Sequence, residues 1–144
     1  MTTRMTILNP EFSVSTDAAL RQALAGFPQL ELALVFGSVA RGTPRPDSDL
    51  DMAVACPHRA LTVDETLDIV AALAQHTGRP VDLIDLYAVA PPLLGQIVRH
   101  GRRILGSDAA YGRLISRNLF DQADFAPYRN RVLTERRAAW MPSL

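Results

Sequence analysis

Cysteine is nearly absent from this sequence of 144 residues, because Cys56 is the only one. A single cysteine excludes an internal disulfide, and it excludes a thiolate metal cluster built from this chain alone. We interpret Cys56 as a small apolar residue at a strand end rather than as a nucleophile. His58, His76 and His100 do not cluster at the spacing of metal ligands, so we expect them to be structural or surface residues.

The sequence also lacks an excess of charge and a long hydrophobic run. Fifteen Lys and Arg balance fifteen Asp and Glu, so the pull that nucleic-acid phosphates exert on a basic protein is missing and direct nucleic-acid binding is not expected. No run of about 18 apolar residues could span a bilayer. Residues 1–12 carry polar side chains and Pro10 where a signal peptide needs an apolar stretch. We therefore expect a cytoplasmic protein without a membrane anchor.

The remaining composition is that of a globular domain, with 48% hydrophobic and 21% charged residues. A length of 144 residues is typical of one domain. No internal repeat is visible, and the ten prolines are scattered rather than gathered in a linker. We predict a single domain over residues 1–144, in which residues 108–144 form a C-terminal helical segment and tail.

Hydrophobic periodicity and turn residues predict helices that alternate with strands. The expected strands cover residues 31–36, 49–55, 81–86 and 102–105. The expected helices cover residues 16–27, the segment from Thr62 to Gly78, the segment from Pro91 and Pro92 to His100, and the segment from Asp108 onward, capped by Ser107. This order indicates an α/β or α+β domain in which helices cover a small mixed sheet.

Two of the expected helices carry local signals that can be checked. Thr62 and Glu65 have the spacing of a capping box, which predicts where the second long helix begins. The last helix is expected to be apolar on one side and to bend or end at Pro127. The residues expected on that apolar side are Leu114, Ile115, Leu119 and Phe120.

The residues expected to perform chemistry lie in two short segments, GSVARG at residues 37–42 and SDLD at residues 48–51. Gly37 allows the backbone to turn sharply and to approach a phosphate, and Ser38 offers a hydroxyl and an amide at an expected helix start. The loop TPRP at residues 43–46 interrupts regular structure between the two segments. We therefore expect triphosphate oxygens to bind at Gly37 and Ser38.

Asp49 and Asp51 are two residues apart on an expected strand, so both carboxylates point to one face. An isolated Asp-x-Asp pattern is usually a solvated strand face, but here it follows Ser38 after ten residues and opens an apolar strand. Carboxylate oxygens suit Mg²⁺, which keeps several waters and binds through one or two carboxylates plus substrate phosphates. Metal and triphosphate are therefore expected to bind together.

This joint pattern resembles the minimal nucleotidyltransferases of the polymerase-beta superfamily, whose signature is Gly-Ser, ten residues, then Asp-x-Asp. The fuller pattern of the prokaryotic MNT branch, G-S-x-A-R-G followed by S-D-x-D, is also met. The matching residues are Gly37, Ser38, Ala40, Arg41, Gly42, Ser48, Asp49 and Asp51. The resemblance implies a polymerase-beta-like fold, two Mg²⁺ ions, and transfer of AMP from ATP to a hydroxyl group with release of pyrophosphate.

The resemblance also implies a third carboxylate on the strand after the next helix, where Asp82 and Asp85 face opposite sides. The family's V-D-L pattern favours Asp82, which would complete the second metal site or deprotonate the acceptor, and leaves Asp85 as a strand-end or surface acid. Arg41 has two interpretations that both stay open: it binds β- or γ-phosphate oxygens, or it caps the short helix from the surface.

The acceptor of AMP is also indicated by resemblance, which is loose after Leu86. Proteins of the MNT type are often antitoxins paired with a HEPN-domain RNase toxin, which implies transfer of AMP to a tyrosine of that toxin. One alternative is a non-catalytic antitoxin that neutralises the toxin by binding. Another is an adenylyltransferase of the aminoglycoside type, although those enzymes normally have an additional helical domain. The tail from Tyr128 to Trp140 either docks a partner or is a solvated terminus.

Overall fold

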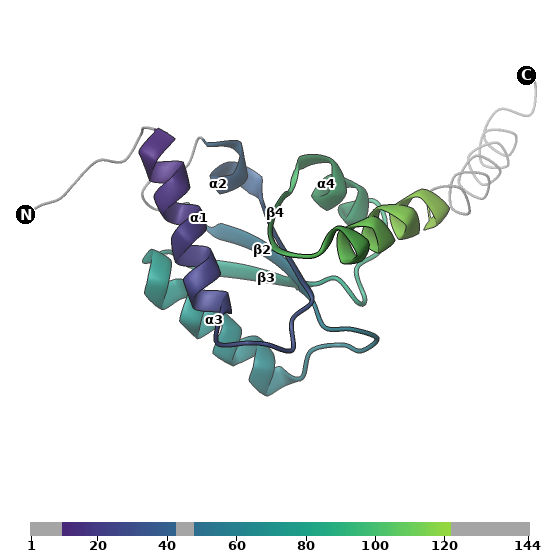
Figure 1. Cartoon of the computed structure of the whole chain (residues 1–144), viewed down its shortest axis with the longest axis horizontal. Coiled ribbons are helices and arrows are strands. Elements are labelled where there is room, and N and C mark those ends of the chain that lie inside the picture. Colours follow the sequence, from purple (N-terminus) through teal and green to yellow (C-terminus); the bar gives the residue numbers. More distant parts are fainter. Residues whose placement is uncertain (1–9, 43–47, 122–144) are drawn as a thin grey trace, which may run out of the picture.

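The computed structural model describes residues 10–42 and 48–121, which alternate between helices and strands (Figure 1). The elements are α1 (Pro10–Leu24), β1 (Leu32–Phe36), α2 (Gly37–Arg41), β2 (Leu50–Ala55), α3 (Val63–Thr77), β3 (Val81–Asp85), α4 (Leu93–His100) and β4 (Arg102–Gly106). Residues 108–121 form a further helix. The expected order of elements is confirmed, whereas the TPRP loop, the bend at Pro127 and the tail lie outside the described residues.

The four strands form one mixed sheet in the order β3-β2-β1-β4. β1 is antiparallel to both β2 and β4, and β2 is parallel to β3. A parallel pair needs a long crossover connection, and α3 provides it between β2 and β3. The expectation of a small mixed sheet covered by helices is therefore confirmed.

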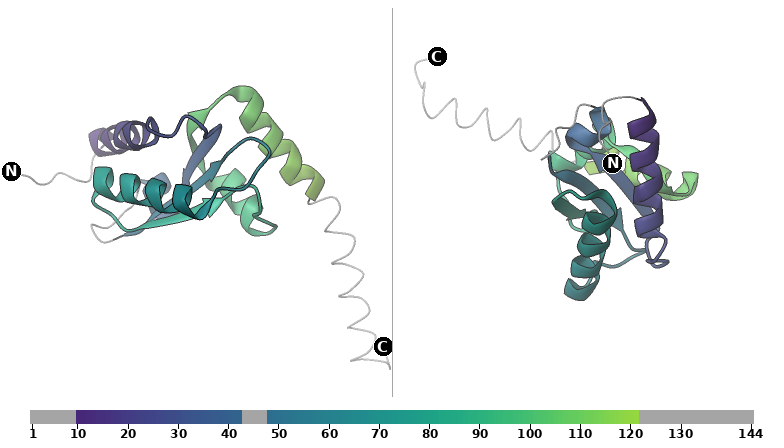
Figure 2. Two further views of the ribbon diagram at one scale, coloured as in Figure 1. Left: turned by 90° about the horizontal axis from the view of Figure 1, so that it is seen from below. Right: turned by 90° about the vertical axis from the view of Figure 1, so that its left-hand side faces the viewer.

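Helices cover both faces of the sheet, so β1 is apolar along its whole length rather than alternating. Ala33 and Val35 pack in a core with residues of α1 and α3, whereas Leu32 and Leu34 pack in a second core with α4 and Leu114. α1 and α3 lie side by side on one side of the sheet, and Figure 2 shows this pair from two further directions. β1 and β2 are therefore the buried centre of the domain.

The ends of α3 agree with the sequence prediction. The side chain of Thr62 accepts a hydrogen bond of 3.1 Å from the Glu65 N–H, and the Glu65 carboxylate accepts one of 2.9 Å from the Thr62 N–H. At the other end Gly78 has φ +70°, and its N–H donates to the carbonyl of Ala74. The predicted capping box and glycine stop are both confirmed.

Two predicted helix starts are wrong, and the predicted apolar side of the last helix is only partly buried. α1 begins at Pro10 rather than at residue 16, because proline is tolerated in the first turn of a helix. Pro92 is the residue before α4 and follows a cis bond from Pro91, so the two prolines do not form the first helical turn. Leu119 and Phe120 are 61% and 72% exposed, since the last helix runs beyond the sheet (Figure 1).

No helix in the two described ranges combines the length and apolar character that crossing a membrane requires. The longest described helices, α1 and α3, have 15 residues each. About 20 residues are needed to cross the hydrocarbon core of a bilayer.

Thr62→Ala is expected to lower the free energy of unfolding by about 1 kcal/mol, because it removes the side-chain half of the capping box. Urea unfolding monitored by circular dichroism measures this change. Thr66→Ala is the matched control on the same helix, since the Thr66 hydroxyl only donates back to the Thr62 carbonyl and contributes little. Equal losses for the two variants would contradict a stabilising cap.

Candidate active site

Most of the predicted chemical residues meet at one edge of the sheet, where β1 ends and β2 and β3 begin. Gly37 directly follows β1, whose last residue Phe36 pairs with Asp51 of β2. Asp51 in turn pairs with Asp82 of β3. Because residues paired across neighbouring strands lie on the same face, the Asp82 carboxylate is beside that of Asp51.

Gly37 is required at its position for two separate reasons. Its φ of +75° lies in the left-handed region, which side chains with a Cβ avoid. A Cβ at this position would also overlap the Asp51 carboxylate oxygen Oδ2 and lie 3.1 Å from Cγ. The backbone of the Gly-Ser turn and the carboxylate of Asp51 are therefore in direct contact.

Three carboxylates repel one another at this edge of the sheet. Burial raises the pKa of Asp51, and the neighbouring charges of Asp82 and Asp49 raise it further, while Arg41 lowers it. Asp49 is exposed and lies just before β2, which begins at Leu50 rather than at residue 49 as expected. A bound cation would relieve this repulsion, which is the electrostatic character expected of a cation site.

The two candidates for a third carboxylate have different surroundings. Asp85 pairs with Val54 at the far end of β3, and its carboxylate accepts hydrogen bonds from the N–H groups of Leu61 (2.8 Å) and Tyr87 (2.9 Å). Those bonds hold two loops, which is a structural role. The strand register brings Asp82, and not Asp85, to Asp51.

The carboxylates fit a shared Mg²⁺ better than a closed metal site. Among residues 10–42 and 48–121, no three Asp, Glu, His or Cys side chains converge into a group that would by itself hold a metal ion. Mg²⁺ keeps several waters and takes substrate phosphates as further ligands, so it does not need such a cage. The all-oxygen donor set of Asp49, Asp51 and Asp82 therefore fits an ion that arrives with a nucleotide.

The surroundings of the cysteine and of the three histidines agree with the expectation that they are core or surface residues. Cys56 is buried in the core with α1 and α3, and burial is the main cause that raises the pKa of its thiol. A raised pKa lowers the thiolate fraction, which agrees with the interpretation of Cys56 as an apolar core residue. His58, His76 and His100 are all exposed on separate elements.

Ser38 and Arg41 both lie on the short helix α2. Gly42 ends this helix with φ +74°, and its N–H donates to the carbonyls of Ser38 and Val39. Arg41 is exposed, and its positive charge acts to lower the pKa of the Asp51 carboxyl. Both interpretations of Arg41 are compatible with this position.

Two arginines beside the site carry no motif and were missed in the sequence. Arg102 of β4 donates from Nη1 to the Ala40 carbonyl of α2 (2.8 Å), and it forms a bidentate ion pair with Asp17 of α1. Arg79 donates from Nη1 to the carbonyl of Ser48 (3.2 Å), just before the Asp-x-Asp segment. Both contacts join residues far apart in the chain, so no local pattern could have indicated them.

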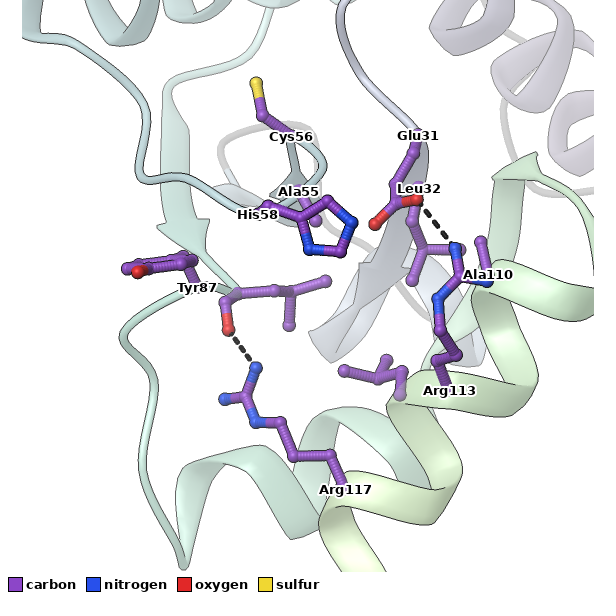
Figure 3. Close-up of a pocket in the computed structure, with 11 residues that line it drawn as sticks. Glu31, Leu32, Ala55, Cys56, His58, Tyr87, Ala110, Arg113 and Arg117 are labelled. Atoms are coloured by element: carbon purple, nitrogen blue, oxygen red, sulfur yellow. Dashed lines mark hydrogen bonds and ion pairs between the residues drawn. The ribbon is translucent and has the colours of Figure 1, made fainter.

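A cavity of about 230 Å³ lies at the opposite edge of the sheet, away from the carboxylates (Figure 3). None of the predicted site residues lines it. Its main polar groups already have partners, since Arg113 pairs with Glu31 and Arg117 donates to the carbonyls of Leu86 and Val89. The cavity and the predicted site residues therefore lie at different ends of the strands.

Comparison with known families identifies the family of the chain. A family model described as polymerase beta, nucleotidyltransferase matches residues 19–110, which include the whole site. The chain belongs to this family of nucleotidyltransferases.

One curated relative is similar in sequence to more than half of the chain. The chain is 34% identical over 82 residues to protein adenylyltransferase MntA of Shewanella oneidensis. That match covers 56% of this chain and 57% of the relative, so the chain spans little more than half of the curated relative.

Two solved structures are also similar. A chain in the crystal structure of a toxin–antitoxin with AMP-PNP has a TM-score of 0.64 and 26% identity, over 81% of this chain and 98% of that one. A rebuilt structure of tri-AMPylated Shewanella oneidensis HEPN toxin in complex with MNT antitoxin has a TM-score of 0.61 and 23% identity, over 84% and 98%, and shows the same fold.

Gly37→Ala is expected to lower the free energy of unfolding by about 2–4 kcal/mol, because a Cβ adds overlap with Asp51 to the strain of a positive φ. Gly78→Ala is the matched control, since Gly78 has φ +70° but no atom within 4 Å of an added Cβ. It should cost only about 1–2 kcal/mol. Urea unfolding compares them, and equal losses would mean that the Asp51 carboxylate moves aside freely.

Asp51→Asn is expected to raise the free energy of unfolding at neutral pH in buffer without divalent cations. The folded-state pKa of Asp51 is raised, so its ionised form opposes folding, and this opposition grows as pH rises through that pKa. The gain should therefore shrink toward acidic pH, where Asp51 is protonated in both states. Urea unfolding across this pH range measures the gain. Asp68→Asn on the exposed face of α3 is the control variant. A gain that is independent of pH would contradict the electrostatic cause.

Proposed function

We propose that this chain is an adenylyltransferase that moves AMP from ATP to a tyrosine hydroxyl of a HEPN-domain RNase toxin, and so acts as its antitoxin. The observation that supports this most strongly is the position of Asp51, whose carboxylate touches Gly37 and lies beside Asp82. A phosphate-binding turn and a cation-binding carboxylate are thereby in contact, as transfer of a nucleotidyl group requires.

Each residue of the site has a part in the proposed reaction. The Gly37 and Ser38 backbone, with the Ser38 hydroxyl, would bind triphosphate oxygens, and Arg41 would add a positive charge near the β- or γ-phosphate. Asp49, Asp51 and Asp82 would hold Mg²⁺. When bound, two such ions would neutralise charge on the phosphates and on the entering and leaving oxygens.

The reaction that this arrangement would support is a single in-line displacement. The acceptor oxygen forms a bond to the α-phosphorus while the bond between the α-phosphorus and the bridging oxygen breaks, and pyrophosphate leaves. The proton of the acceptor hydroxyl is lost, and Asp82 would accept it if it does not serve as a ligand of the second ion. The protein contributes mainly position and charge.

The relatives support the nucleotide and the partner. The curated relative is named a protein adenylyltransferase, and a 26% identical structure is of a toxin–antitoxin with AMP-PNP. The described domain is small and its carboxylates are exposed or only partly buried at a sheet edge, which leaves room for a partner protein to present the acceptor. We also propose a cytoplasmic location, since an RNase toxin acts on the RNA of the cell.

Incubation of the chain with ATP, Mg²⁺ and its cognate HEPN toxin is expected to add AMP mass to the toxin. Asp49→Ala combined with Asp51→Ala should reduce the rate by at least about 10³-fold, because the cation then loses two ligands. Chelation of Mg²⁺ should have the same effect. Intact-protein mass spectrometry measures the product, and peptide mapping identifies the acceptor.

Asp68→Ala is the matched control for that experiment, because it removes an exposed carboxylate of α3, a helix that carries none of the site residues. Its rate should equal that of the wild type. Absence of AMP on the toxin with the wild-type chain would overturn the transfer reaction. Full neutralisation of the toxin in cells by the double variant would favour an antitoxin that acts by binding, and transfer to an aminoglycoside instead would favour a small-molecule enzyme.

A further inference from the structure

Arg102 connects three elements that lie around the proposed nucleotide site. Its Nη1 donates to the carbonyl oxygen of Ala40 at 2.8 Å, near the end of α2. Its Nε and Nη2 donate to the two carboxylate oxygens of Asp17 at 3.2 and 2.8 Å, which fixes the plane of the guanidinium against α1. The two side chains are 37% and 19% exposed, so water screens this pair less than it screens a surface pair.

The start of β4 brings Arg102 to this position. Gly101 ends α4 with a 2.7 Å hydrogen bond from its N–H to the Ile97 carbonyl, and a Cβ at Gly101 would overlap that carbonyl oxygen. Gly101 is the single residue between the end of α4 and the start of β4. Arg102 pairs with Val35 of β1, whose side chain faces the core beneath α1, and so the guanidinium reaches both α1 and α2.

The short helix α2 depends on such outside contacts. It has only five residues, and a helix of that length is not stable by itself. No side chain caps its first turn. At its last turn, the Gly42 N–H donates to the carbonyls of Ser38 and Val39, and the Arg102 guanidinium donates to the carbonyl of Ala40. Val39 packs α2 into the core, and Arg102 adds a side-chain hydrogen bond from outside the helix to its last turn.

We propose that Arg102, held by Asp17, is a positioning residue for nucleotide binding. The inference rests on the proposed function, since Ser38 and Arg41 on α2 are the groups that would meet the triphosphate. Arg102 acts through the Ala40 backbone and does not touch the nucleotide. Its ion pair with Asp17 keeps the guanidinium aimed at Ala40, so that α2 holds its phosphate-binding groups in place before ATP arrives.

Arginine is needed in this position because its planar fork makes three contacts at once. A lysine ammonium at the end of a flexible stem can keep the ion pair with Asp17 or the hydrogen bond to the Ala40 carbonyl. It cannot form a bidentate pair with Asp17 and the hydrogen bond to Ala40 at the same time. Arg102→Lys therefore separates the charge of the side chain from its shape. Asp17→Asn leaves the arginine in place and removes the negative charge that aims it.

The test measures Mg²⁺-dependent binding of AMP-PNP by titration calorimetry, with the free energy of unfolding of each variant. Arg102→Met should raise the Kd about tenfold, which corresponds to one lost charge-assisted hydrogen bond. Arg102→Lys and Asp17→Asn should raise it less, with near wild-type stability. In the transfer assay, the KM for ATP should rise more than kcat falls, because the carboxylates are untouched. Arg113→Met is the matched control, since it also removes an arginine–carboxylate pair, and its Kd should equal that of the wild type.

A purely structural Arg102 would give the opposite pattern, with lower stability and an unchanged Kd of the folded protein. That result would overturn the positioning role. If Arg102→Met does not fold, the same comparison is made with Arg102→Lys and Asp17→Asn, whose unchanged Kd would equally overturn it. Absence of AMP-PNP binding by the wild type would overturn the proposed function and this inference with it, whereas wild-type binding that Arg102→Met leaves intact would overturn this inference alone.

Discussion

The contact between the Gly37 backbone and the Asp51 carboxylate is the constraint on which the rest of the site depends. It requires a residue without a Cβ, in a left-handed conformation, directly after β1. It also requires β1 and β2 to pair with Phe36 opposite Asp51, because a slip of one residue would turn Asp51 to the other face of the sheet. The two cores on either side of the sheet maintain that register, so the apolar packing of the whole domain determines where one carboxylate lies.

The same register argument extends to the third strand. β2 and β3 are parallel, with Asp51 opposite Asp82, so the site is formed where the carboxyl end of one strand meets the amino ends of two others. Asp85, three residues further along, lies at the opposite end of β3 from the site. Its carboxylate holds two loops by accepting hydrogen bonds from their backbone N–H groups. One short strand therefore carries two aspartates whose roles differ because their neighbours differ.

Local patterns in the sequence predicted the helices and strands well, since a capping box and an apolar strand each depend on adjacent residues. Features that depend on distant residues could not be predicted in this way. The sequence favoured Asp82 over Asp85 only by resemblance to a family pattern, and the pairing of β2 with β3 gives the geometric reason. The contacts of Arg102 are with residues 62 and 85 positions away in the chain. Likewise, the exposure of Leu119 and Phe120 depends on where the sheet ends and not on the helical pattern that contains them.

An acidic site of this kind opposes the stability of the domain that carries it. Burial and two neighbouring carboxylates raise the pKa of Asp51, which means that the ionised carboxylate is less favourable here than it is in water. Such repulsion would push the carboxylates apart if they were carried by a flexible loop. Asp51 instead lies on β2, a central strand that is hydrogen-bonded to a neighbour on both sides. Strand pairing therefore positions the Asp51 carboxylate, and a cation that arrives with a nucleotide would remove the repulsion at this position.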